Sequence, residues 1–151
     1  MGTATLHIVT GQTGAGKTTY ARALAERESA LLLAIDDWMG RLFWADALDY
    51  LGTWAHERVA RCTAQMREVL GQTLPLGLPA VADWAEARSI AVRLHWIDLD
   101  AATRWARVQA RNAAGGGGTG FVVTRAMFDY MEDLWQAPTA AEMARLGARI
   151  T

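Results

Sequence analysis

Short apolar runs alternate with amphipathic segments along this chain, and the alternation predicts an α/β fold. Residues 5–10 (TLHIVT) are rich in β-branched residues and predict a strand, and 18–28 has the apolar spacing of a helix. Two further apolar runs are interpreted as buried strands. The first, 30–37 (ALLLAIDD), ends in two carboxylates, and the second, 77–82 (GLPAVA), is followed by one. Residues 92–97 (VRLHWI) predict a fourth strand. Strands that alternate with helices are typical of a parallel sheet covered on both faces.

Three further helices follow from apolar residues that recur at steps of three and four. A long helix is predicted where this spacing is carried by Ala55, Val59, Cys62, Met66 and Val69. A second helix is expected over 101–112, and Thr124 can cap a third, whose apolar stripe comprises Met127, Phe128, Met131, Leu134 and Trp135. Pro138 would end that helix, Thr139 can cap a short one, and 149–151 can add an edge strand.

One connection is too short for this arrangement. Only WAEARSIA separates Asp83 from Val92, whereas a crossover between parallel strands usually needs a dozen residues or more. Either the strand at 92–97 is placed differently, or a segment is missing from the chain.

Composition limits the classes of protein to consider. A chain of 151 residues predicts one domain over 1–151 with a three-layer core. The formal net charge of −1 is unlike a surface for nonspecific nucleic-acid binding. One cysteine excludes a disulfide framework within the chain, and the three histidines lack metal-ligand spacing. Without an apolar run of about 18 residues or a signal peptide, we expect a cytoplasmic protein that does not contact membranes.

The only lysine, Lys17, lies in GQTGAGKT, which fits the phosphate-binding pattern G-x-x-x-x-G-K-[ST]. The pattern stands between a predicted strand and a predicted helix, as this loop requires. Its backbone N–H groups would surround the phosphates of ATP, Lys17 would lie between phosphate oxygens, and the Thr18 hydroxyl would bind Mg²⁺. The predicted nucleotide contacts are Gly11, Thr13, Gly14, Ala15, Gly16, Lys17, Thr18 and Thr19.

Three carboxylates are candidates for the remaining chemistry. Asp36 and Asp37 end the second predicted strand, on the edge where open α/β sheets bind ligands. Either carboxylate could accept the proton of a substrate hydroxyl, and we favour Asp36 as this base. Asp83 follows the third predicted strand and could hold Mg²⁺ through water, or could simply terminate the strand.

Spacing of i, i+3 and i+7 places three arginines on one face of the helix after the fourth strand: Arg104, Arg107 and Arg111. Like charges on one stripe repel unless an anion lies among them, so we expect the arginines to contact phosphates. The glycine-rich run 114–120 could act as a hinge, which predicts a lid over 104–120. The alternative is a solvated basic face in which Asp100 pairs with Arg104.

Four segments together resemble the small P-loop kinases grouped with zeta toxins, chloramphenicol phosphotransferase and polynucleotide kinase: GQTGAGKTT, AIDDWMGRLF, TRWARVQARN and TGFVVTRAMFDYMEDLWQAP. The resemblance implies an AAA-type ATP-binding kinase with a five-stranded parallel sheet in the order 2-3-1-4-5. It also implies that Asp36 activates the acceptor hydroxyl and that the three lid arginines contact phosphates. The chain departs from the group at Met39, where several relatives have an arginine for which Arg41 could substitute.

These features predict an ATP- and Mg²⁺-dependent kinase that phosphorylates a hydroxyl of a small molecule. The expected acceptor contacts are Asp37, Trp38, Arg41, Trp44 and Trp54. An adenine-nucleotide switch that hydrolyses slowly is an alternative. A GTPase of the usual kind is excluded, because the only lysine is already in the loop and cannot supply an Asn-Lys-x-Asp element. A 5′-polynucleotide kinase is disfavoured by the near-neutral charge. Oligomeric state is not indicated.

Overall fold

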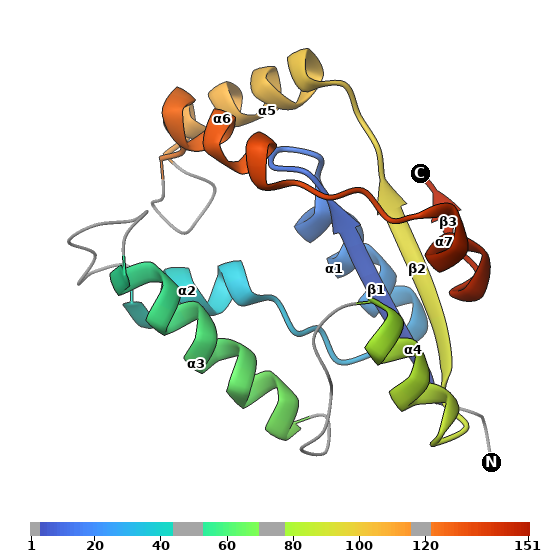
Figure 1. Ribbon diagram of the computed structural model, residues 1–151. Coiled ribbons are helices and arrows are strands. Elements are labelled where there is room, and N and C mark those ends of the chain that lie inside the picture. Colours follow the sequence, from blue (N-terminus) through green and yellow to red (C-terminus); the bar gives the residue numbers. More distant parts are fainter. Residues whose placement is uncertain (1–3, 44–52, 70–77, 116–121) are drawn as a thin grey trace.

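The computed structural model describes residues 4–43, 53–69, 78–115 and 122–151 (Figure 1). In chain order the elements are β1 (Thr5–Gly11), α1 (Lys17–Glu28), α2 (Ile35–Phe43), α3 (Thr53–Val69), α4 (Leu78–Glu86), β2 (Ala91–Ile97), α5 (Ala101–Ala113), α6 (Arg125–Leu134), α7 (Ala140–Arg145) and β3 (Arg149–Ile150).

The described strands form one parallel sheet in the order β1-β2-β3. β1 and β2 pair along their whole lengths, from Thr5 opposite Ala91 to Gly11 opposite Ile97. The short strand β3 pairs with the later part of β2. Because the strands are parallel, their carboxyl ends meet at one edge of the sheet. The loop after Gly11 leaves from that edge, so whatever it binds lies there.

Alternate residues of the strands face two different helical layers. Ile8 and Leu94 are neighbours across β1 and β2, and Leu94 is completely buried with Ala82 of α4 and Leu146 after α7. His95, one residue further along β2, faces α1 instead. Figure 1 shows α1 on one side of the sheet and α4 and α7 on the other. The fold is therefore α/β with three layers, as the sequence predicts, although the sheet is small.

α5 and α6 form a second, smaller core beyond the carboxyl ends of the strands (Figure 1). Val108 of α5, Phe128 of α6 and Val123, which lies just before α6, are buried against one another. The Asn112 side chain donates to the carbonyl of Val123 at 2.8 Å and accepts from its N–H at 3.1 Å. The predicted cap is confirmed at Thr124, whose side chain accepts from the Met127 N–H. These contacts fix α6 beside α5 at the edge of the sheet where the loop begins.

Two of the predicted strands are wrong. Residues 30–34 have no regular structure, and α2 begins at Ile35, so Asp36 and Asp37 lie in the first turn of a helix. Carboxylates there are stabilised by the positive end of the helix. The run 77–82 is also mostly helical, because α4 spans Leu78–Glu86 with its apolar residues on one face. Short apolar runs fit a buried strand and a buried helix equally well, and the sequence could not separate them.

The predicted five-stranded order 2-3-1-4-5 is also wrong for the described residues. The observed strands correspond to the first, fourth and fifth predicted strands, which keep the order expected of those three. The short connection before 92–97 is explained by the same correction, because it joins a helix, α4, to β2 and is not a crossover between strands. The long helix α3 is confirmed, but it packs chiefly against α2 and not on the sheet.

A cluster of two histidines and a tyrosine lies between the sheet and α1. Nε2 of His95 is 2.9 Å from Nδ1 of His7, and Nδ1 of His95 is 2.8 Å from the Tyr20 hydroxyl. His95 is 3% exposed, and burial lowers its pKa from 6.5, with smaller contributions from His7 and from the arginines at 149, 27 and 93. The folded protein therefore binds a proton at His95 less readily than the unfolded chain does.

We predict that the free energy of unfolding decreases as the pH falls below 6.5, towards the lowered pKa of His95. Above pH 6.5 the imidazole of His95 is neutral in both the folded and the unfolded protein, so His95 no longer makes the free energy of unfolding depend on pH. Urea unfolding between about pH 8 and about pH 5 measures the slope. His95→Gln should lower stability at neutral pH but flatten the slope. Equal slopes in wild type and His95→Gln would contradict the assignment.

Candidate functional site

The loop between β1 and α1 has the conformation that its glycines allow. Gly14 and Gly16 have φ values of +80° and +99°, in the left-handed region that favours glycine. The loop also packs closely on α5. A Cβ atom at Gly14 would lie 2.5 Å from the backbone oxygen of Arg104 and 2.9 Å from the Val108 side chain. The loop therefore has a shape that other residues at Gly14 could not adopt.

The amino end of α1 offers its N–H groups to an anion. Gly16 is the N-cap and provides no side chain to accept from them, and the first turn contains no carboxylate. Uncapped N–H groups at a helix amino terminus are a favourable site for phosphate. The eight residues predicted to contact nucleotide lie together in this loop and first turn: Gly11, Thr13, Gly14, Ala15, Gly16, Lys17, Thr18 and Thr19.

Lys17 is half-buried at the start of α1, and its amine donates to the carbonyl of Gln12 at 3.0 Å. Burial lowers the pKa of Lys17, and the charge of Asp36 opposes that shift. Arg104 and Arg111 lower the pKa of Lys17 further. The site thus has an excess of positive charge around the lysine, which an anionic ligand would balance.

The two neighbouring aspartates of α2 have different surroundings. Asp37 accepts a hydrogen bond from Arg22 of α1 at 2.7 Å, which holds α2 against α1. Asp36 is exposed and is the carboxylate that interacts with the charge of Lys17. Asp36 lies in the first turn of a helix, and not at the end of a strand as the sequence had suggested. The two carboxylates therefore differ in that Asp37 has a side-chain partner from α1, whereas Asp36 is exposed.

Arg104 was predicted to contact phosphate, but in the structure its guanidinium donates hydrogen bonds to other groups of the protein. It is 2% exposed. Its Nε donates to the Leu99 carbonyl at 2.8 Å, and Nη1 donates to the Thr13 carbonyl at 3.3 Å. Nη1 and Nη2 each donate to one carboxylate oxygen of Glu132 at 2.6 Å. The partner is thus Glu132 of α6, whereas Asp100 caps α5 by accepting from the Thr103 N–H.

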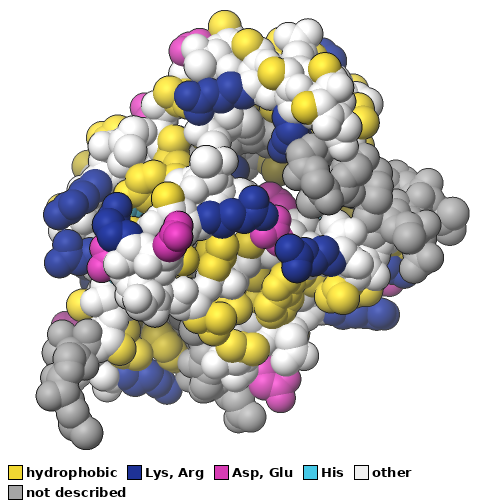
Figure 2. All heavy atoms as spheres, turned by 180° about the vertical axis from the view of Figure 1, so that it is seen from behind, with side chains coloured by type: hydrophobic (Ala, Val, Ile, Leu, Met, Phe, Trp, Pro, Cys, Tyr) yellow, Lys and Arg dark blue, Asp and Glu magenta, His cyan; other side chains and the backbone are white. Residues whose placement is uncertain are grey.

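The other two arginines of the stripe remain on the surface beside the loop. Arg107 is exposed, and its Nη1 donates to the Ala15 carbonyl at 3.0 Å. Arg111 is also exposed and is near enough to lower the pKa of Lys17. In Figure 2, Lys and Arg side chains gather around a hollow below the part of the molecule that contains α5 and α6. Of the predicted lid 104–120, residues up to Ala113 belong to α5, and 116–121 lie outside the described residues.

The structure gives no support to the prediction that Asp83 binds magnesium. It lies on the exposed surface of α4 and pairs with Arg145 of α7. α4 ends just before the amino end of β2, whereas the phosphate loop follows the carboxyl end of β1. Within residues 4–43, 53–69, 78–115 and 122–151, no group of three His, Cys, Asp or Glu side chains could hold a metal ion.

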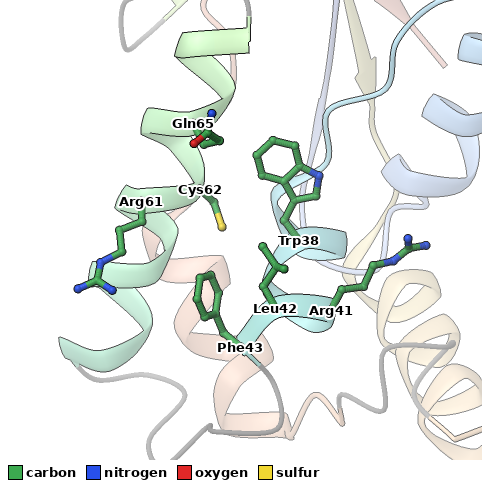
Figure 3. A pocket seen from close by; sticks show the side chains of 7 residues that line it. All are labelled: Trp38, Arg41, Leu42, Phe43, Arg61, Cys62 and Gln65. Carbon is green, nitrogen blue, oxygen red and sulfur yellow. The ribbon is translucent and has the colours of Figure 1, made fainter.

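A cavity of about 470 Å³ lies between α2 and α3 (Figure 3). Its lining comprises Trp38, Arg41, Leu42, Phe43, Arg61, Cys62 and Gln65. In Figure 3 the Trp38, Leu42 and Cys62 side chains extend into the space between the helices, while the guanidinium groups of Arg41 and Arg61 point away from it. A smaller cavity of about 160 Å³ shares Trp38 and Arg41 and adds Leu32, Ala34 and Asp37.

Three predicted acceptor contacts, Asp37, Trp38 and Arg41, therefore line these cavities. Trp54 does not line them, because it lies on α3 with the guanidinium of Arg58 4.2 Å from its ring centre. Trp44 lies outside the described residues. Sequence reasoning missed Glu132, although it lies four residues after the buried Phe128 and so near the inner face of α6.

A family model described as an AAA domain matches residues 6–138, which is most of the chain. The chain belongs to this AAA domain family. The family is P-loop NTPase-like and includes kinases, so the site is that of a nucleotide-binding P-loop domain. A comparison with curated proteins found no match. No helix within the described part of this AAA domain is both long and apolar enough to span a membrane.

We predict that Gly14→Ala destabilises the protein far more than Gly115→Ala. Both glycines have positive φ, so each substitution should cost about 1–2 kcal/mol of backbone strain. Only at Gly14 would the new methyl group also collide with α5, which should add about 1–3 kcal/mol. Urea unfolding of the two variants measures the difference. Equal losses of stability would show that the loop does not pack on α5 as described.

Proposed function

We propose that this protein is an ATP- and Mg²⁺-dependent phosphotransferase that moves the γ-phosphoryl group to a hydroxyl of a small molecule. The observation that carries the proposal is the phosphate loop, with its left-handed glycines, the uncapped start of α1 and the half-buried Lys17. A nucleotide-binding loop alone would suit many NTPases, so we also assign a base: Asp36, which is exposed and whose charge acts on Lys17. Membership of a family that includes kinases supports the same conclusion.

The loop and its cations would hold the triphosphate. The N–H groups at the start of α1 donate to phosphate oxygens, and Lys17 exchanges its contact with the Gln12 carbonyl for one with phosphate. We propose that Arg107 and Arg111 stabilise the negative charge that develops on the phosphoryl group during transfer, because both are exposed beside the loop. Arg104 is not assigned to phosphate, because its guanidinium already has protein partners.

The residues present fit a magnesium ion that is bound mainly through phosphate. Thr18 follows Lys17 in the first turn of α1 and can provide a hydroxyl ligand. The described residues contain no carboxylate cluster that could hold the ion without nucleotide. When bound, Mg²⁺ would neutralise charge on the phosphate oxygens. The loop and Thr18 would then orient the nucleotide for attack.

Asp36 would accept the proton of the acceptor hydroxyl as its oxygen attacks phosphorus. Its exposure leaves the carboxylate accessible to an acceptor, whereas Asp37 is held by Arg22. We place the acceptor along the start of α2, where the smaller cavity adjoins the larger one at Trp38 and Arg41. The lining of Trp38, Leu42 and Phe43 favours an acceptor with an apolar or aromatic body.

Within the AAA domain family, we place this protein among the small P-loop kinases that resemble zeta toxins and chloramphenicol phosphotransferase. A small-molecule acceptor fits better than a polynucleotide, because the formal net charge is −1 and the basic residues near the loop are used for the triphosphate.

Replacing Lys17 with alanine should reduce the affinity for ATP with Mg²⁺ by about 100-fold, or about 2.7 kcal/mol, because the compact charge among the phosphates is lost. Lys17→Arg should recover little, since a planar fork cannot take the place of an ammonium. Titration with a fluorescent ATP analogue measures both. Arg27→Ala, on the exposed last turn of α1, is the matched control and should bind like wild type. Unchanged affinity in Lys17→Ala would remove the assignment of the loop.

Asp36→Asn should lower phosphoryl transfer by about 100-fold or more while leaving ATP affinity nearly unchanged, because the substitution removes the base but not the loop. The assay is transfer of a labelled γ-phosphate to a panel of apolar and aromatic alcohols. Asp37→Asn is the comparison variant, and a larger loss there would exchange the two roles. ATP hydrolysis with no transfer to any alcohol would favour the nucleotide switch over the kinase.

A further inference from the structure

The phosphate loop is held from outside through its carbonyl oxygens. The Thr13 carbonyl accepts from Arg104, and the Ala15 carbonyl accepts from Arg107. A trans peptide points its C=O and the following N–H in opposite directions. Because these two carbonyls point towards α5, the N–H groups of Gly14 and Gly16 point away from α5. The arginines of α5 thus orient the donors that a phosphate would need.

Arg104 depends in turn on Glu132 of α6. The carboxylate accepts from both terminal nitrogens of Arg104 at 2.6 Å, a two-pronged contact that fixes the plane of the guanidinium. The side chain of Arg104 is 3% exposed and that of Glu132 is 23% exposed. A guanidinium so deeply buried needs a carboxylate to balance its charge.

Glu132 also contacts the loop itself. Its Oε2 accepts from the side-chain nitrogen of Gln12 at 3.0 Å. One carboxylate therefore connects α6 to two consecutive loop residues, to Gln12 through its side chain and to Thr13 through Arg104. Gln12 and Glu132 are 120 residues apart in the chain, so this connection exists only in the folded protein.

We propose that Glu132 is a positioning residue for the phosphate loop. Through Arg104 and Gln12 it holds the loop in the conformation that binds nucleotide, and it balances the buried charge next to Lys17. The inference rests on the proposed function, because it assigns Glu132 to the affinity for ATP. Glu132 touches neither phosphate nor the reacting atoms. Its loss should weaken nucleotide binding by the folded protein, and not only lower stability.

The test compares Glu132→Gln with Asp129→Asn, which removes a carboxylate from the exposed face of the same helix, where it pairs with Arg125. Affinity for a fluorescent ATP analogue with Mg²⁺ is measured well below the unfolding temperature, with circular dichroism to confirm folding. We expect Glu132→Gln to weaken binding about tenfold or more, and Asp129→Asn to bind like wild type. A merely structural Glu132 would lower the melting temperature and leave this affinity unchanged.

Gln12→Ala keeps the proposal testable if Glu132→Gln does not fold, because it breaks the second connection without leaving a buried charge unpaired. It should also weaken binding, and combining it with Glu132→Gln should weaken binding by less than the product of the two effects. Binding that needs Lys17 but neither Glu132 nor Gln12 would overturn this inference alone. Binding that is absent, or independent of Lys17, would overturn the proposed function and this inference together.

Discussion

The organisation of this molecule depends on the pairing of one buried guanidinium. Arg104 is almost completely buried, and a charge in that position is tolerated only if each part of it has a partner. Glu132 and the carbonyls of Leu99 and Thr13 provide those partners. They come from α6, from the segment before α5 and from the phosphate loop. Satisfying Arg104 therefore requires all three to assemble at the same edge of the sheet.

That edge is where the parallel sheet directs its carboxyl ends. β1 delivers the loop there, and α1 begins with N–H groups that no side chain caps. The other side of the site is formed by α2, which Asp37 holds against α1 through Arg22. The same helix carries Asp36 and lines both cavities, so the proposed base and the walls that we assign to the acceptor share one element.

Strongly local signals led to correct predictions, and ambiguous ones did not. The phosphate loop was recognised because it needs glycines and a lysine at fixed spacing, and the caps at Thr124 and Thr139 are made within one helical turn. The runs at 30–37 and 77–82 are apolar without a clear period, and neither is a strand. Whether such a run becomes helix or strand depends on the surface that it packs against. The run that forms α2 packs against α1 and α3, and the run that forms α4 packs against β2.

The sequence by itself determined the α/β class and the nucleotide loop, because each is specified within a few positions. Only the tertiary structure decided which arginine would be buried. The spacing of Arg104, Arg107 and Arg111 indicates a shared stripe, but the contact with Glu132 arises when α6 packs beside α5. The tertiary structure likewise separated Asp36 from Asp37, because Arg22 engages only one of them. Partners distant in the chain leave no local pattern, since their contact depends on how complete elements pack.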